Sequence, residues 1–266
     1  LDEPFYSPAK GQGGQVTRSR SETKNMTTRT TLKYDKSFDD VDVSAFASHV
    51  ARTYDFNYLY AERTNLVLPQ GTDIANGVVN APGAGYTDEL RDESYIFSTN
   101  IGIKDKYFIT GTYNRDASSR FINEKWGDFF GLGLAWVISE EDYFGSDIFD
   151  FLKVKASYGQ IGNSGGVGLY PGYNLYSVNN LNDNISLAFT TKGNKDLTWE
   201  TSNQFNFGVE FKIGDFVDGS IEAYNKLTTD MFFNRSTGPS VGYASITVND
   251  GESVSYTHLT LPTTGS

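Results

Sequence analysis

The segment FNFGVEFKI alternates strictly between apolar and polar side chains. Phe205, Phe207, Val209, Phe211 and Ile213 occupy every second position, and Asn, Gly, Glu and Lys stand between them. Successive side chains of a strand point to opposite faces, so this segment predicts a two-sided β-strand. Its steps of about 3.3 Å, tilted by about 40°, rise roughly 20 Å, close to the apolar band of a membrane barrel. The apolar face is therefore a candidate lipid-facing surface, although a strand of a soluble sandwich alternates in the same way.

The same alternation recurs along the chain and predicts roughly eight strands. Short and long gaps between them tend to alternate. In an up-and-down meander alternate gaps lie at the same end of the sheet, so nearly all long loops fall on one rim, as in a membrane barrel. The predicted strands are residues 26–34, 41–50, 94–103, 107–115, 129–138, 152–158, 205–213 and 219–232, and the long loops are residues 51–93, 116–128 and 159–197.

Composition excludes several classes of protein. The mean hydropathy is −0.42 and no apolar run approaches the length of a transmembrane helix. The net charge is −11, with no basic cluster beyond Arg18, Arg20 and Lys24, so nucleic acid is not an expected partner. The chain has no cysteine and hence no disulfide framework or thiolate site. Because it starts within polar sequence and without an initiator Met, we expect a fragment whose secretion signal lies upstream.

Five motifs follow one another in a fixed order: KYFITGTYNRDASSRF, GLAWVISEEDYF, FLKVKASYGQIGN, GNKDLTWETSNQFNFGVEF and AYNKLTTDMFF, the last followed by STGPSVGYASITVNDGE. Together they resemble the SusC/RagA family of TonB-dependent outer-membrane transporters over roughly residues 26–252. The resemblance implies a 22-stranded barrel plugged by an N-terminal domain. It also implies import of oligosaccharides or peptides, captured with a SusD-like surface lipoprotein and driven through TonB. The plug and the first strands would lie outside this chain, which would supply about eight to ten strands of the barrel's second half.

The resemblance ends near Glu252. We expect residues 1–252 to be a partial barrel domain of a TonB-dependent receptor. Residues 253–266 read SVSYTHLTLPTTGS, which resembles a peptide translated from sequencing-adapter read-through more than a barrel strand. This tail is therefore predicted to be non-native.

The predicted long loops carry candidate ligand contacts. Tyr170, Tyr173 and Tyr176 stand among Pro, Gly and Asn residues, and aromatic faces beside amide groups are suited to stacking on sugars or peptides. The alternative is that they pack the loop against its neighbours or against a lipoprotein lid. Residues 54–60 have a similar aromatic density and the same ambiguity.

Residues 162–166 fit the nucleophile pattern G-x-S-x-G, which requires a strand-to-helix turn with histidine and acid partners. The flanking sequence has no helical period, and the only histidines are His49 and His258, the latter in the predicted tail. An ordinary loop is the favoured interpretation, and no catalytic residue is predicted.

Two charged clusters are also interpreted as structural. Glu140, Glu141 and Asp142 could ligate a hard cation, but Ser139 with Asp142 fits an S-x-x-D cap of a single helical turn. A second cluster contains Asp116, Arg120 and the paired Ser118 and Ser119; it could orient a ligand, but a salt-bridged turn between two strands is favoured.

The sequence therefore predicts an all-β fold: part of an antiparallel up-and-down transmembrane β-barrel of the bacterial outer membrane that imports a nutrient. No enzyme activity, cofactor or metal is predicted. The expected partners are a SusD-like lipoprotein, TonB, membrane lipid, and an oligosaccharide or peptide substrate. The alternatives are a soluble secreted β-sandwich that binds glycans and a hydrolase on a β scaffold. Trp199 is expected as an interfacial aromatic, and Glu200, Gln204, Asn206 and Glu210 are expected to face a hydrated lumen.

Overall fold

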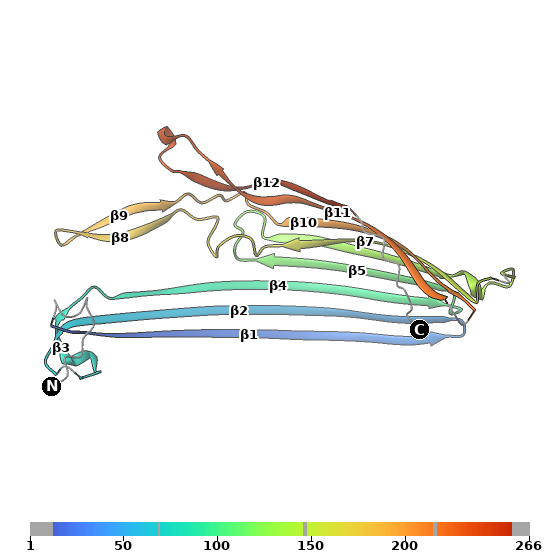
Figure 1. The fold of residues 1–266 in the computed structure, drawn as a ribbon, viewed down its shortest axis with the longest axis horizontal. Coiled ribbons are helices and arrows are strands. Elements are labelled where there is room, and N and C mark those ends of the chain that lie inside the picture. The colour runs from blue at the N-terminus through green and yellow to red at the C-terminus, as the bar shows by residue number, and fades with distance from the viewer. Residues whose placement is uncertain (1–12, 69, 146–147, 215–216, 257–266) are drawn as a thin grey trace. The chain divides into compact units, whose positions relative to one another are not determined.

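The computed structural model describes residues 13–68, 70–145, 148–214 and 217–256. This part of the chain forms strands and three short 3-10 helices, with no helix long and apolar enough to cross a membrane (Figure 1). The strands are β1 (Gln15–Phe38), β2 (Val41–Leu66), β3 (Gly77–Asn80), β4 (Ala84–Ile103), β5 (Tyr107–Ser118), β6 (Trp126–Val137), β7 (Phe151–Asn163), β8 (Leu175–Leu181), β9 (Asn184–Thr191), β10 (Glu200–Ile213), β11 (Val217–Ser236) and β12 (Ser245–Tyr256). The 3-10 helices are η1 (Ile74–Asn76), η2 (Ile138–Glu140) and η3 (Pro239–Val241).

The main sheet is an antiparallel meander. Its strand order is β1-β2-β4-β5-β6-β7-β10-β11-β12, with β3 paired to β2 beside this path, and β8 and β9 form a separate hairpin. Each strand of the path lies beside the next one along the chain apart from these two insertions. The all-β, antiparallel fold predicted from the alternating sequence is thereby confirmed.

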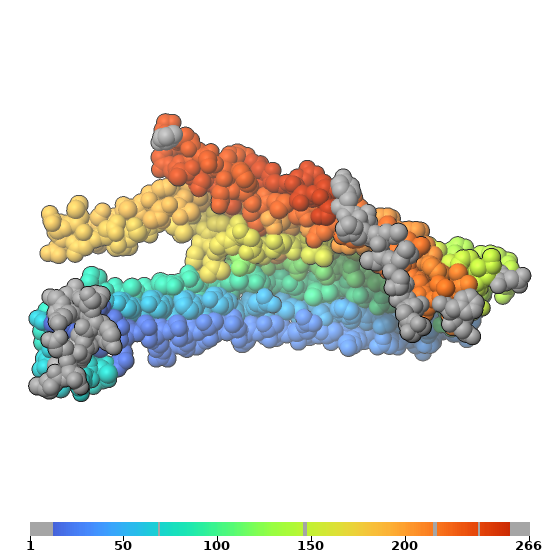
Figure 2. Space-filling view, in the orientation of Figure 1, coloured from blue at the N-terminus to red at the C-terminus, as the bar shows by residue number. Residues whose placement is uncertain are grey.

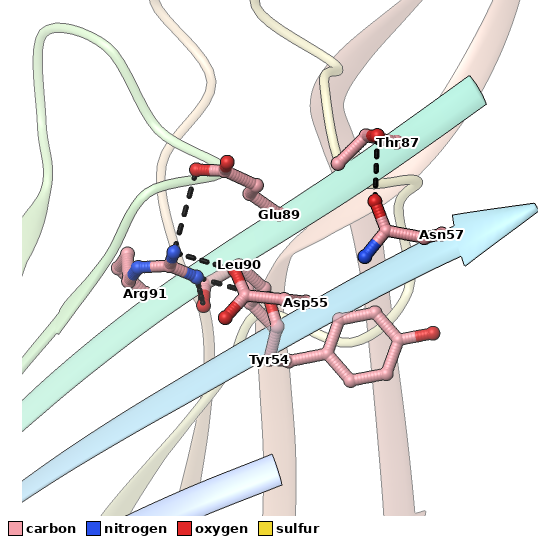
Figure 3. Close-up of polar contacts among 7 residues, drawn as sticks. All are labelled: Tyr54, Asp55, Asn57, Thr87, Glu89, Leu90 and Arg91. Atoms are coloured by element: carbon pink, nitrogen blue, oxygen red, sulfur yellow. Dashed lines mark hydrogen bonds and ion pairs between the residues drawn. The ribbon is translucent and has the colours of Figure 1, made fainter. Parts of the chain in front are cut away.

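The strands separate into two compact units, one of residues 1–27 and 52–91 and the other of residues 28–51 and 92–266. In the first unit, β3 pairs with the end of β2, and the amide of Asn76 bonds both backbone groups of Leu68, at 2.8 and 2.7 Å. Arg91 of β4 donates to the carboxylate of Asp55 at 2.5 Å and to the carbonyl of Tyr54 at 3.0 Å (Figure 3). The bonds of Arg91 therefore tie β4 to β2 through a charged side chain.

Short turns of the second unit connect β1 to β2 and β4 to β5. Lys104 and Asp105 both have positive φ, 55° and 54°, which is the backbone of a type I′ hairpin turn and matches the twist of the flanking strands. The connections at residues 119–125, 164–199 and 237–244 lie at the other end of these strands. We call the two ends the short-turn end and the long-connection end; the longer connection at residues 138–150, between β6 and β7, also lies at the short-turn end.

A small buried cluster marks the long-connection end. Phe121, Phe129, Leu197 and Trp199 are its members, and Phe232 packs against it. The Trp199 ring lies 5.3 Å from the Phe121 ring and 5.7 Å from the Phe129 ring, and its indole N–H donates to the carbonyl of Lys125 at 3.2 Å. The prediction of an interfacial Trp199 is therefore wrong. β10 begins one residue later, so the alternation of the strand does not extend to this side chain, which is 8% exposed.

The β8–β9 hairpin (yellow-orange) extends away from β10 and β11 (Figure 2). Asn182 and Asp183 form its turn with positive φ, 50° and 62°. Register pairs Tyr176 with Phe189 and Val178 with Leu187, so one face of the hairpin is apolar while Ser177 and its partner Ala188 lie on the other.

Several predicted boundaries differ from the structure. The loop predicted at residues 51–93 is largely strand, because β2 continues to Leu66 and β4 starts at Ala84. The loop predicted at residues 159–197 contains the β8–β9 hairpin. β12 was not predicted as a strand, and it includes residues 253–256 of the predicted tail; residues 257–266, with His258, lie outside the described residues. The boundary at Glu252 stays a prediction.

Candidate functional site

The two faces of β10 differ in chemistry. We call the face that carries Phe205, Phe207, Val209, Phe211 and Ile213 the apolar face, and the opposite face the polar face. Directly opposed residues of neighbouring strands share a face, so the register extends both faces across the second unit. The row through Phe207 is apolar on all six strands from β4 to β7 and from β10 to β11. It consists of Ile101, Ile109, Leu134, Ala156, Phe207 and Ala223.

In the described part of the chain, the apolar face lacks a covering second sheet. Phe205 is 50% exposed and Phe207 is 43% exposed. A soluble sandwich would bury these rings against another layer of strands. The exposure of the rings therefore gives the sandwich alternative no support.

The polar face carries an ion-pair network that joins three strands. Lys155 of β7 lies between Glu210 of β10, at 2.7 Å, and Glu222 of β11, at 2.5 Å, and Lys153 lies 3.6 Å from Glu210. Gly208 makes room for this arrangement, since a Cβ there would lie 2.7 Å from the Lys155 side chain. The network explains why Glu210 is on this face, as the alternation predicted, but its lysine partners and Glu222 were not anticipated.

Two concave regions of about 380 and 410 Å³ lie beside each other and share Phe108 and Thr110 in their linings. Thr110 donates to Asn100 at 2.8 Å, and Asn206 donates to Ser157 at 3.1 Å, both on the polar face. Hydroxyl, amide and paired charged groups thus stand on this face together with Phe108. Such a surface is compatible with water or with a second polar protein layer.

The apolar face ends in amphipathic aromatic residues near the short-turn end. Tyr107 and Trp136 are directly opposed, with ring centroids 6.2 Å apart, and both donate to the Glu141 carboxylate, the indole N–H at 2.9 Å. Glu141 thereby fixes the polar ends of two rings whose bodies lie on the apolar face. Aromatic residues with one apolar and one hydrogen-bonding end are typical of membrane interfaces.

The Glu141 turn differs in detail from the prediction. The residue preceding η2 is Val137, which makes no side-chain capping bond, and the Ser139 hydroxyl is buried without a hydrogen-bond partner among the described residues. The predicted S-x-x-D cap is therefore wrong. The turn is held instead by Glu141 through Tyr107, Trp136 and the Lys106 ammonium, 3.7 Å away.

The pKa of Glu141 lies below its ordinary value of 4.5, chiefly because the Tyr107 hydroxyl and then the Trp136 indole bond to the ionised form. This stabilisation is complete above the unfolded-state pKa and is lost as the pH falls through the lower, folded-state pKa. We expect acidification from pH 6 to pH 3 to lower the urea unfolding midpoint of the full-length protein more than that of Glu141→Gln. The matched control is Glu140→Gln, whose response should equal that of the wild type; equal responses of all three proteins would contradict the assignment.

The apolar face has a second boundary at Tyr113, toward the long-connection end. Its hydroxyl donates to Asp128 at 2.6 Å, and Arg115 pairs with the same carboxylate at 3.7 Å while its guanidinium lies over the Trp126 ring at 5.3 Å. Tyr107 and Tyr113 are six residues apart on β5, or about 20 Å along a strand. The apolar face is thus bounded at both ends by aromatic residues with hydrogen-bonded polar ends.

The loop tyrosines separate in the structure. Tyr170 and Tyr173 belong to a turn closed by the 3.1 Å bond from the Tyr173 amide to the Tyr170 carbonyl, whereas Tyr176 is on β8 with its ring 5.6 Å from Phe189. Tyr170 lines a cavity near the base of the hairpin, and Tyr173 and Tyr176 are exposed outside that lining. A ligand or lid contact by all three tyrosines stays a prediction.

The aromatic residues 54–60 are on strand β2 and not in a loop. The Phe56 and Tyr58 rings lie 5.7 and 5.4 Å from Tyr86 of β4, all within the first unit. Asn57 accepts a 2.8 Å bond from Thr87 (Figure 3). These residues therefore pair the two strands with each other.

The residues that could serve in catalysis or metal binding have local structural partners. Residues 162–166 span the end of β7 and the turn after it, without a helix, and the Asn163 side chain accepts from the Gly165 amide at 2.9 Å. His49 pairs with Glu93 at 2.9 Å and stacks on Tyr95. Within the described ranges, no group of three or more potential metal ligands comes together.

The turn after β5 is also structural, but not by the predicted ion pair. Ser118 donates to Asp92 at 2.8 Å and is almost fully buried. In the described part of the chain no ion pair joins Asp116 to Arg120, and the Arg120 Nε atom is buried without a partner. The predicted salt bridge is wrong because Asp116 continues the ladder of β5, opposite Gly127.

A meander with one apolar face bounded by aromatic residues and one polar face is typical of the wall of a transmembrane β-barrel. The model of the family described as TonB dependent receptor-like, beta-barrel, matches residues 2–256. The chain belongs to this family, whose barrels lie in the outer membrane and whose members are receptors and transporters.

Related proteins agree with this family. TonB-dependent receptor P39 of Formosa agariphila is 31% identical over 235 residues, which cover 83% of this chain and 22% of the relative. TonB-dependent receptor SusC of Bacteroides thetaiotaomicron is 29% identical over 52% of this chain and 15% of its own length. A solved structure of the RagAB peptide transporter has a TM-score of 0.76 and 25% identity, and the match covers 89% of this chain and 27% of that one. The chain thus spans about a quarter or less of these relatives.

Proposed function

We propose that the full-length protein containing this chain imports a nutrient across the outer membrane, driven through TonB and assisted by a SusD-like surface lipoprotein. The observation that carries the proposal is the two-faced meander of a chain in the TonB-dependent receptor-like family. In this proposal the five apolar side chains of β10 face lipid, the Lys155 network faces the lumen, and the long-connection end is extracellular. No bond-breaking step is proposed.

The substrate class is an oligosaccharide or a peptide. Similarity to SusC and to the RagAB peptide transporter supports a substrate that is too large for passive pores and is captured together with a lipoprotein. Tyr170, Tyr173 and Tyr176 are proposed as ligand or lid contacts at the extracellular side. Tyrosine rings can serve both substrate classes, because they offer an apolar face and a hydroxyl.

The test is uptake by the parent bacterium. Cells that carry or lack the full-length gene are given mixed, isotopically labelled peptides and oligosaccharides, and the accumulated label is measured with and without depletion of TonB. We expect at least one labelled nutrient to require both the gene and TonB, and re-expression of the gene to restore its uptake. Uptake that depends on neither, for every nutrient, would overturn the proposal.

A further inference from the structure

A cavity of about 320 Å³ lies at the long-connection end of the second unit. Its lining comes from the connection that follows β7, the ends of the β8–β9 hairpin, β11 and β12. Its volume is at the small end of the range of about 300–1,000 Å³ for ligand cavities. The cavity is therefore matched in size to a small group or to the end of a chain.

Part of the cavity lining is apolar and packs against the buried cluster. Leu169, Leu175 and Phe232 contribute to it, and the Phe232 ring stacks on Phe121 of the buried cluster at 6.3 Å. A Cβ at Gly166 would lie 2.7 Å from the Phe232 ring, so the glycine allows the chain to approach the ring closely. A wall held in place by the core of the unit offers a preformed surface for an apolar side chain.

Lys192 also belongs to the lining of the cavity. Lys192 is half-buried and its backbone bridges to Ile246, but its side chain has no ion pair or hydrogen bond among the described residues. The other half-buried lysines in this part of the chain, Lys106, Lys153 and Lys155, are all paired with carboxylates. The positive charge of Lys192 has no counter-charge in the described part of the chain, so Lys192 is a candidate for pairing with an anionic group of a ligand.

A second donor lines the same cavity. The Asn234 side-chain oxygen accepts from Thr247 at 2.8 Å, which directs its amide N–H₂ group elsewhere, and that group has no partner in the described ranges. The lining contains no aspartate or glutamate. A sugar hydroxyl group is neutral and both donates and accepts, whereas a carboxylate only accepts and carries a negative charge. A carboxylate can therefore take a charge-assisted bond from an ammonium and a second bond from an amide.

We propose that this cavity binds the C-terminal residue of a peptide, with its carboxylate on Lys192 and Asn234 and an apolar side chain against Leu169, Leu175 and Phe232. The inference rests on the proposed import function and narrows its substrate class. It assigns the specificity to a free carboxylate beside an apolar residue, two features that a neutral glycan lacks.

The experiment uses the purified full-length transporter with its co-purified partner. Its ligands are the peptide Ala-Ala-Ala-Ala-Leu with a free carboxylate and the same peptide as an amide, measured by calorimetry. We expect the amide to bind about tenfold more weakly, as for the loss of one charge-assisted bond. Lys192→Met should weaken binding of the free acid by about tenfold and hardly change binding of the amide. Lys192→Arg should retain most of the affinity, because the positive charge stays.

Lys195→Met is the matched control, since Lys195 is an exposed lysine of the same segment outside the cavity lining. Its affinity should equal that of the wild type. The inference would be overturned if the wild type bound acid and amide equally, or bound no peptide. It would also be overturned if Lys192→Met lost binding of an acidic oligosaccharide, tetragalacturonate, without any effect on peptides. If the inference fails but another nutrient is taken up in a TonB-dependent way, the proposed import function is still supported. If no nutrient is taken up in this way, the import function itself is wrong.

Discussion

Phe207→Arg is expected to destabilise the full-length barrel in a lipid bilayer by about 2–4 kcal/mol, the cost of an arginine near the bilayer midplane on the lipid face. Phe207 lies in the middle of the apolar face, in a row that is apolar on six neighbouring strands. The arginine would have to leave its charge in hydrocarbon or distort the bilayer to reach water. The measurement is the urea unfolding free energy in phospholipid vesicles.

Asn206→Arg is the control for this substitution. Asn206 is the adjacent residue of β10 and lies on the polar face, where it donates to Ser157. In a hydrated lumen the arginine can stay solvated, so we expect a cost below about 1 kcal/mol, similar to other surface substitutions. Equal costs at the two positions would mean that hydrocarbon does not cover the Phe207 face, and the assignment of the faces would be wrong.

The middle of each long strand could be predicted from sequence because apolar and polar side chains alternate there. Phe205 to Ile213 alternate since one face must be apolar and the other polar. Beyond the apolar face this constraint ends. β1 runs through Arg18, Arg20 and Lys24 with polar residues on both faces, and β2 continues to Leu66, so their outer parts carry no alternation signal. Pairing with neighbouring strands extends them.

Other features were missed although a local signal existed. Asn182 and Asp183 stand between two alternating runs, and both residue types tolerate positive φ, which is the pattern of a two-residue hairpin turn. The partners of Glu210 were harder to predict from the sequence. Lys155 and Glu222 come from strands whose register depends on the whole meander, and no single segment specifies which carboxylate a lysine will meet.

Lys192 illustrates the limit for the candidate site. In the sequence it is one of 22 basic residues, and nothing in its neighbours distinguishes it from Lys195. Only the fold shows that one of these lysines lines a cavity without a counter-charge while the other is exposed. Tyr170 was selected for its aromatic character and does line the same cavity, whereas Tyr173 and Tyr176 do not.

Trp199→Ala is expected to destabilise the long-connection end by about 3–5 kcal/mol, the usual cost of truncating a buried tryptophan. The indole contacts Phe121 and Phe129, and it satisfies the Lys125 carbonyl. The loss should be local, because the strands below this cluster are held by their own ladder. Hydrogen exchange of the full-length protein should therefore accelerate in residues 119–125 and 193–199 while β7 and β10 stay protected.

Trp126→Ala is the control, since Trp126 is 37% exposed and its ring contacts Arg115 and Tyr95 at the edge of the apolar face. Its loss should cost about 1 kcal/mol, the range of an exposed cation–π contact with some lost packing. The Trp199 cluster also supports Phe232, whose ring forms part of the peptide cavity. If the cluster fixes the position of the Phe232 ring, Trp199→Ala weakens binding of the free-acid peptide and of its amide by the same factor. Lys192→Met, in contrast, weakens binding of the free acid alone. Unchanged exchange in both segments would show that the long connections are held by contacts other than this cluster.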